Sequence, residues 1–147
     1  MVHLRSWGKF VLSTVGLTNS LAPYVGMAPV IVQTLLREAQ LRPTDVLFDV
    51  GCGDGRVCVE AASTYGVCAV GVDTDADMVV QAQQAAKQRG VDHLVRIVHA
   101  NARKHDFSEA TVVSMYLTTA GNLKLRDRLR EQLRPGARVL SYTWHMP

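Results

Sequence analysis

Apolar and polar residues alternate along the chain in blocks whose period changes from strand-like to helix-like and back. Short apolar runs predict five buried strands, over 46–50, 67–72, 94–99, 111–117 and 137–143. Apolar residues at helical spacing predict helices over 30–40, 54–65, 75–89 and 119–133. Such an alternation indicates an α/β fold, in which a parallel sheet carries helices on both faces through right-handed crossovers.

Glycine and proline mark the ends of several predicted elements. Pro29 suits the first turn of the first helix, and Gly66 and Gly90 end later helices. The first helix should be built on a set of apolar positions, Val30, Ile31, Leu35 and Ala39. The short polar link 100–110 predicts only a turn. We expect an N-terminal arm over 1–22 and one domain over 23–147.

Composition and charge exclude several classes of protein. The 147 residues are 48% hydrophobic and 20% charged, and the net charge of +3 is too small to indicate nucleic-acid binding. No apolar stretch is long enough to predict a transmembrane helix. The histidines are scattered, so no metal site is predicted.

The cysteines and the N-terminus bear on the compartment. Cys52, Cys58 and Cys68 are odd in number, form no CxxC pair and fall within predicted core elements, which favours a reducing compartment. The first acidic residue is Glu38, and an acid-poor, weakly basic start is compatible with a mitochondrial presequence. A plain flexible or partly helical arm is the other interpretation. We therefore expect a mitochondrial or cytoplasmic location.

The stretch VLFDVGCGDGR, residues 46–56, places three glycines directly after the first strand. In an open parallel sheet this is where ligands bind. A dinucleotide fold needs G-x-G-x-x-G, but Arg56 occupies the last glycine position. A P-loop needs a Lys-Ser/Thr pair after the glycines, and none is present. Both phosphate-binding interpretations are weakened. An NAD-binding enzyme is therefore the third of the functions that we consider, after the two described below.

The pattern D-x-G-x-G-x-G from Asp49 to Gly55 resembles motif I of the class I S-adenosylmethionine-dependent methyltransferases. The resemblance implies a Rossmann-like fold and S-adenosyl-L-methionine as the cofactor. It implies that Asp49 faces the amino-acid end of the cofactor, and that Gly51 and Gly53 let the backbone approach it closely.

Two further polar residues follow the next strands. Asp73 ends the second strand, where an acid accepts hydrogen bonds from ribose hydroxyls, although it could instead cap the next helix. We prefer Thr74 or Asp75 as the cap. Asn101 stands where many members of the resembled family have an Asp that accepts from the adenine amino group, and its amide oxygen can also accept. The alternative for Asn101 is a turn former.

The segments PYVGMAP and SMYLTTAGNLKLRDRLREQLRPGARVLSY are similar to one branch of that superfamily. The branch contains mitochondrial protein-lysine N-methyltransferases that act on inner-membrane proteins, and smaller prokaryotic relatives. The resemblance implies a protein substrate with an acceptor lysine, with a membrane protein as one candidate, and no nucleic acid. Gly26 departs from the branch pattern, which commonly has proline there.

Three residues are candidates for the reacting end of the cofactor. Met115 and Tyr116 end the fourth strand and should border the transferred methyl group, where Tyr116 could orient an amine with its hydroxyl or ring. Tyr24 could fold over the cofactor. Packing in the core for Tyr116, and in a loop for Tyr24, are the alternatives. The N/D-P-P-Y segment of enzymes that methylate amide or base nitrogens is absent.

Two features leave the function open. The last crossover helix is basic, which indicates either a solvated face or contact with an acidic partner or membrane surface; its cations, with that of the turn after it, are Lys124, Arg126, Arg128, Arg130 and Arg134. The C-terminal antiparallel hairpin of complete relatives should be lacking, so the fifth strand should form an exposed apolar edge. A shortened chain is the preferred interpretation, a homodimer that pairs through this edge comes next, and cover by the N-terminal arm is the third. A non-catalytic cofactor-binding module that acts through a partner, or a small-molecule methyltransferase, is therefore the alternative function.

Overall fold

The computed structural model describes residues 26–142. The predicted arm over 1–22, Tyr24 and the last residue of the predicted fifth strand lie outside this range. No helix within 26–142 is long and apolar enough to cross a membrane.

Every predicted strand and helix is present. The strands are β1 (Val46–Val50), β2 (Cys68–Asp73), β3 (Val95–His99), β4 (Val112–Met115) and β5 (Arg138–Ser141). The helices are α1 (Pro29–Glu38), α2 (Arg56–Tyr65), α3 (Ala76–Arg89) and α4 (Thr119–Gln132). The link 100–110 contains turns and bends only, as predicted.

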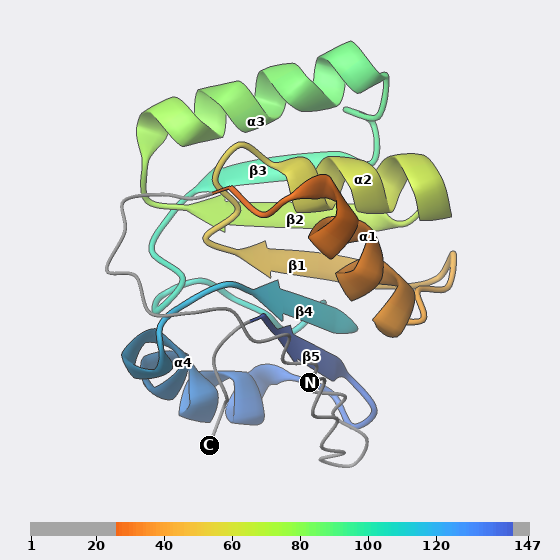
Figure 1. Ribbon diagram of the computed structural model, residues 1–147. Helices are drawn as coiled ribbons and strands as arrows, with labels where there is room; N and C mark the ends of the chain where they lie inside the picture. Colours follow the sequence, from red (N-terminus) through yellow and green to blue (C-terminus); the bar gives the residue numbers. More distant parts are fainter. Residues whose placement is uncertain (1–25, 143–147) are drawn as a thin grey trace.

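The strands form one parallel sheet in the order β3-β2-β1-β4-β5 (Figure 1). The chain runs outward from β1 through β2 to β3, and then returns to the other side of β1 with β4. The order therefore reverses between β1 and β4, and ligands in such sheets bind beside the carboxyl ends of these strands. The predicted α/β architecture with a parallel sheet is confirmed.

Helices cover both faces of the sheet (Figure 1). One face carries α1, α2 and α3, with a core that includes Leu36, Leu47, Ala61, Ala86 and Val112. The other face carries α4 and the 100–110 link, with a core that includes Phe48, Phe107, Val113, Leu125 and Leu129. Successive residues of β1 and β4 therefore point alternately into the two cores.

Three details differ from the sequence-based expectation. Val30 is 64% exposed, and α1 instead buries Val32, Leu35 and Leu36, which lie on the face that meets α2. Helix α2 begins at Arg56 rather than at residue 54, because the preceding glycine has left-handed backbone. Cys68, at the first position of β2, is exposed rather than in the core.

Strand β5 lies at the edge of the sheet, as expected. Its apolar side chains are buried on the two faces of the sheet, because Val139 packs toward α4 and Leu140 packs into the core under α1 and α2. Within residues 26–142 its one strand partner is β4, and all pairings are parallel. Pairing of two copies through this strand stays a prediction.

An ion-pair network stabilises the end of the sheet at which strands β1, β4 and β5 begin. The Arg138 guanidinium lies 2.5 Å from the Asp45 carboxylate and also donates to the carbonyls of Ala39 and Gln40 after α1. The Thr111 hydroxyl donates to the same carboxylate at 2.7 Å. Burial raises the pKa of Asp45, but the hydrogen bonds from Arg138 and Thr111 outweigh it and hold the pKa below its ordinary 3.8.

We expect Asp45→Asn to lower the free energy of unfolding by about 2 kcal/mol at neutral pH, because it removes the charge that Arg138 faces. A carboxyl whose folded pKa is depressed contributes stability above its unfolded pKa and loses it as the pH falls through its folded pKa. The difference between the two proteins should therefore shrink below about pH 4. Urea unfolding at neutral and acidic pH measures it, with exposed Asp92→Asn as the control; an equal loss at both pH values would contradict the assignment.

Candidate functional site

The glycine loop after β1, residues 51–55, turns back on itself through three left-handed glycines. The φ angles of Gly51, Gly53 and Gly55 are 72°, 53° and 79°, a region that side chains rarely allow. Gly55 serves packing as well, because a Cβ there would lie 2.7 Å from the Cβ of Ala82 on α3. The third glycine of the motif thus lets α3 approach the loop.

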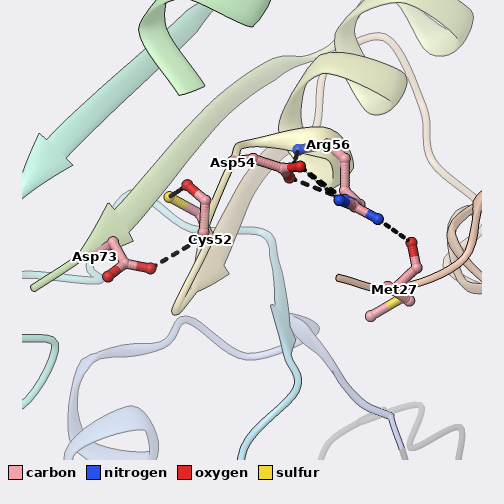
Figure 2. Close-up of polar contacts among 6 residues, drawn as sticks. Met27, Cys52, Asp54, Arg56 and Asp73 are labelled. Carbon is pink, nitrogen blue, oxygen red and sulfur yellow. Dashed lines mark hydrogen bonds and ion pairs between the residues drawn. The ribbon is translucent and has the colours of Figure 1, made fainter. Parts of the chain in front are cut away.

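Asp73 fastens this loop to the end of the neighbouring strand. One of its carboxylate oxygens accepts from the Gly53 amide at 2.8 Å (Figure 2). The other accepts from the Asp75 amide at 2.9 Å. The cap of α3 is Asp75, whose side chain accepts from the amides of Asp77 and Met78. The preference for Asp75 or Thr74 as the cap is confirmed. The Asp73 side chain contacts the glycine loop and is not the cap.

A cleft of about 200 Å³ opens beside these groups at the carboxyl ends of the strands. Residues that follow or end the first four strands line it together with residues of α4, among them Gly51, Asp73, Asn101, Arg103, Leu117 and Lys124. The topology thus brings together three of the predicted site residues, Gly51, Asp73 and Asn101. The Asn101 oxygen also accepts from the Arg103 amide at 2.9 Å, so Asn101 forms a turn at the rim as well.

Asp49 lies under the loop, on the face covered by α1 and α2. It is buried, and the Ser114 hydroxyl of β4 donates to its carboxylate at 2.7 Å. Burial raises the pKa of Asp49 to about 7; the bond from Ser114 opposes this, and the charges of Asp73 and Asp54 add to it. A nearby cation would favour the ionised carboxylate.

The two predicted residues at the end of β4 point in different directions. The Met115 side chain is buried in the core on the α4 side, so any contact of this residue with the cofactor falls to its backbone. Tyr116 is 42% exposed, and its ring lies 5.1 Å from that of Tyr142. It is therefore not a core aromatic. Tyr24 lies outside the described residues.

Sequence reasoning missed Ser114, Tyr142 and the role of Arg56. A serine or tyrosine at a buried strand has no sequence pattern that marks it as a site residue. The contact between Asp49 and Ser114 becomes apparent only from the register of β1 and β4, which places the two residues side by side. In the sequence, Arg56 is informative only because it occupies the last glycine position of the dinucleotide-binding motif. Its guanidinium bonds to the Asp54 carboxylate and donates to the Met27 carbonyl at 2.7 Å (Figure 2).

The charge of the loop favours one of the ligands considered from the sequence. The carboxylates of Asp49, Asp54 and Asp73 interact around the loop, and only Asp54 among them is paired with a cation, that of Arg56, in the described residues. The left-handed Gly51 presents bare backbone to the cleft beside Leu117. A nucleoside with a sulfonium and an ammonium therefore fits the loop better than a dinucleotide with its pyrophosphate does.

Comparison with known proteins agrees with this geometry. The family model described as the ANTKMT methyltransferase domain matches residues 49–147. A protein-lysine N-methyltransferase of Saccharolobus islandicus is 37% identical over 125 residues, which span 84% of this chain and 78% of that protein. A lysine N-methyltransferase of Xenopus laevis, named for its action on ATP synthase, is 29% identical over 85% of this chain, which covers only 54% of that protein.

Solved structures show the same similarity. An RNA methyltransferase of Salinibacter ruber, in complex with S-adenosyl-L-homocysteine, is 43% identical with a TM-score of 0.82 and covers 83% of this chain and 80% of its own. A SAM-dependent methyltransferase from Geobacter sulfurreducens, with the same ligand, is 24% identical and has the same fold, with a TM-score of 0.70 over 78% of this chain and 48% of its own.

Fold and site together define a class I S-adenosylmethionine-dependent methyltransferase. Within that class, the chain belongs to the ANTKMT methyltransferase domain family. S-adenosyl-L-methionine is therefore its cofactor, as the glycine pattern indicated. The roles of the individual cofactor-binding residues stay predictions.

We expect Asp73→Ala to weaken binding of S-adenosyl-L-methionine about tenfold or more, because it removes the predicted acceptor for the ribose hydroxyls and releases the Gly53 amide. Asp75→Ala is the matched control. It removes the same charge two residues away and costs about 1 kcal/mol of stability as a lost helix cap, but should leave the affinity nearly unchanged. Titration calorimetry measures both; equal affinities would remove Asp73 from the site.

Cofactor affinity should rise with pH through the ionisation of Asp49. The pKa of about 7 in the free protein should fall when the cofactor ammonium lies nearby, so binding releases a proton and is favoured at higher pH. We expect affinity about tenfold weaker near pH 5.5 than near pH 7.5. Calorimetry across this range tests it, and Asp49→Asn controls for the titration of the cofactor itself. The same pH slope in both proteins would contradict the assignment.

Proposed function

We propose that this chain transfers a methyl group from S-adenosyl-L-methionine to the side-chain amine of a protein lysine. The observation that carries the proposal is the 37% identity to the Saccharolobus protein-lysine N-methyltransferase over 84% of this chain. The acidic glycine loop and its cleft support the cofactor side of the reaction.

The chain's own residues would bind and position the reactants. The cofactor, when bound, supplies a methyl group on a cationic sulfur, a good leaving group, so in-line alignment and exclusion of water supply much of the catalysis. Asp73 would hold the ribose, Asn101 the adenine, and Asp49 the amino-acid end. No strong base is required where desolvation lowers the pKa of the incoming lysine amine.

Tyr116 is the residue that we assign to the acceptor. It directly follows β4, the strand beside β1, and the alternation of that strand, continued by one residue, would place it on the same side of the sheet as Asp49 and Ser114. Its ring is accessible and rests on Tyr142. A phenol in this position can accept a hydrogen bond from the lysine amine or hold its cationic form over the ring face.

An RNA acceptor is the second candidate. Two observations favour it: the Salinibacter relative that is 43% identical is an RNA methyltransferase, and the cations of Arg103 and Lys124 line the cofactor cleft. Against it stand the small net charge of +3 and the lysine methyltransferases among the relatives. A small-molecule acceptor has weaker support: a norajmaline N-methyltransferase of Rauvolfia serpentina is 31% identical, but this chain covers 35% of it. A non-catalytic module has no such observation in its favour.

We place the enzyme in a reducing compartment, mitochondrial or cytoplasmic, because Cys52, Cys58 and Cys68 are free thiols. A membrane-protein substrate is part of this proposal because the Xenopus relative acts on ATP synthase. Pairing of two copies through β5 remains open to measurement by sedimentation.

Incubation with methyl-labelled S-adenosyl-L-methionine and a cell extract tests the acceptor. We expect label that resists nuclease, is released by protease and maps to a methylated lysine, and that is lost with the Asp73→Ala variant. Label that is sensitive to nuclease would instead establish the RNA acceptor. Cofactor binding without any labelled macromolecule would contradict both and favour the non-catalytic module.

A further inference from the structure

The Arg56 side chain ties the chain before α1 to the glycine loop. The Arg56 guanidinium donates to the Asp54 carboxylate through Nε, at 2.9 Å, and through Nη2. Its Nη1 donates to the carbonyl of Met27 at 2.7 Å. Arg56 therefore joins two segments that lie far apart in the sequence, and Figure 2 shows the guanidinium between them.

Gly26 leaves the space that this guanidinium fills. A Cβ built on Gly26 would overlap the end of the Arg56 side chain, and not backbone. Because the guanidinium is held by Asp54 and Met27, it can move away only by giving up these bonds. Gly26, which departs from the branch pattern, and Arg56, which follows the glycine motif, therefore contact each other.

The joined segment lies on the side of the sheet to which Asp49 points. Residues 26–28 lead into α1, which covers this face together with α2, and the Met27 side chain packs against the same core. Figure 1 shows the described chain beginning beside the glycine loop. A cofactor whose amino-acid end faces Asp49 would therefore lie between the loop and this segment.

We propose that Arg56 is a positioning residue that latches the segment before α1 to the glycine loop, so that cofactor affinity depends on the Arg56–Gly26 contact. The inference rests on the methyltransferase function, because the ligand on which it acts is S-adenosyl-L-methionine. Lysine cannot replace Arg56, since one ammonium cannot reach the carboxylate and the carbonyl together with the same geometry. Arg56 touches no reacting atom in this scheme and acts through the segment.

A double-mutant cycle tests the latch, with calorimetric affinity for S-adenosyl-L-methionine as the readout. We expect Arg56→Ala and Arg56→Lys each to weaken binding about tenfold, as for the loss of a charge-assisted hydrogen bond. Gly26→Ala should weaken binding about fivefold in the native background, but less than about twofold once Arg56 is alanine, because contacting residues are coupled. Arg89→Ala, which removes the same charge from the same surface groove, should leave affinity unchanged.

The outcomes separate the latch from the proposed function. Additive effects of Gly26→Ala and Arg56→Ala, or native affinity in both single variants, overturn the latch. Failure of the native protein to bind S-adenosyl-L-methionine overturns the methyltransferase function instead. Should Arg56→Ala fail to fold, Gly26→Ala decides alone, since it removes no side chain: native affinity at an unchanged melting temperature would overturn the proposal.

Discussion

The hydrogen bond from the Gly53 amide to the Asp73 carboxylate is the contact on which the site depends. It joins the end of β1 to the end of β2 at the point where the chain must turn through left-handed glycines into α2. The same carboxylate accepts the Asp75 amide and thereby sets the start of α3. Together with the Gly51 and Cys52 amides, which donate to the Val72 carbonyl, this acidic side chain fixes the loop and the start of α3, and it also lines the cleft.

This arrangement concentrates negative charge where the cofactor carries positive charge. The repulsion of Asp49 by Asp73 and Asp54 is unfavourable in the empty protein, and it is relieved by a cationic ligand. Ser114 opposes the effect of burial on Asp49, and Arg56 neutralises Asp54 on the side away from Asp73. The loop is therefore selective for charge as well as shape, which explains why glycines alone could not distinguish it from a phosphate loop.

The sequence predicted what depends on local pattern. The strands were readable because each is a short apolar run, and the cap at Asp75 because its chemistry is local. The predictions that were wrong depend on tertiary packing. Val30 is apolar like a core residue but lies on the outer side of α1. Ser114 became visible only when β4 was placed beside β1. Arg56 looked like an interruption of a glycine motif, and its partner Met27 lies in another segment.

The two ends of the strands differ in how their charges are paired. At the amino-terminal ends, Arg138 neutralises Asp45 and holds the end of α1, so like charges do not meet there. At the carboxyl ends, Asp54 is paired with Arg56, whereas Asp73 lines the cleft and accepts from the backbone amides of Gly53 and Asp75. The mutual repulsion of Asp49, Asp54 and Asp73 is unfavourable there. The Asp45–Arg138 pair at the other ends of the same sheet is favourable, so charge stabilises the fold at one end and favours a cationic ligand at the other.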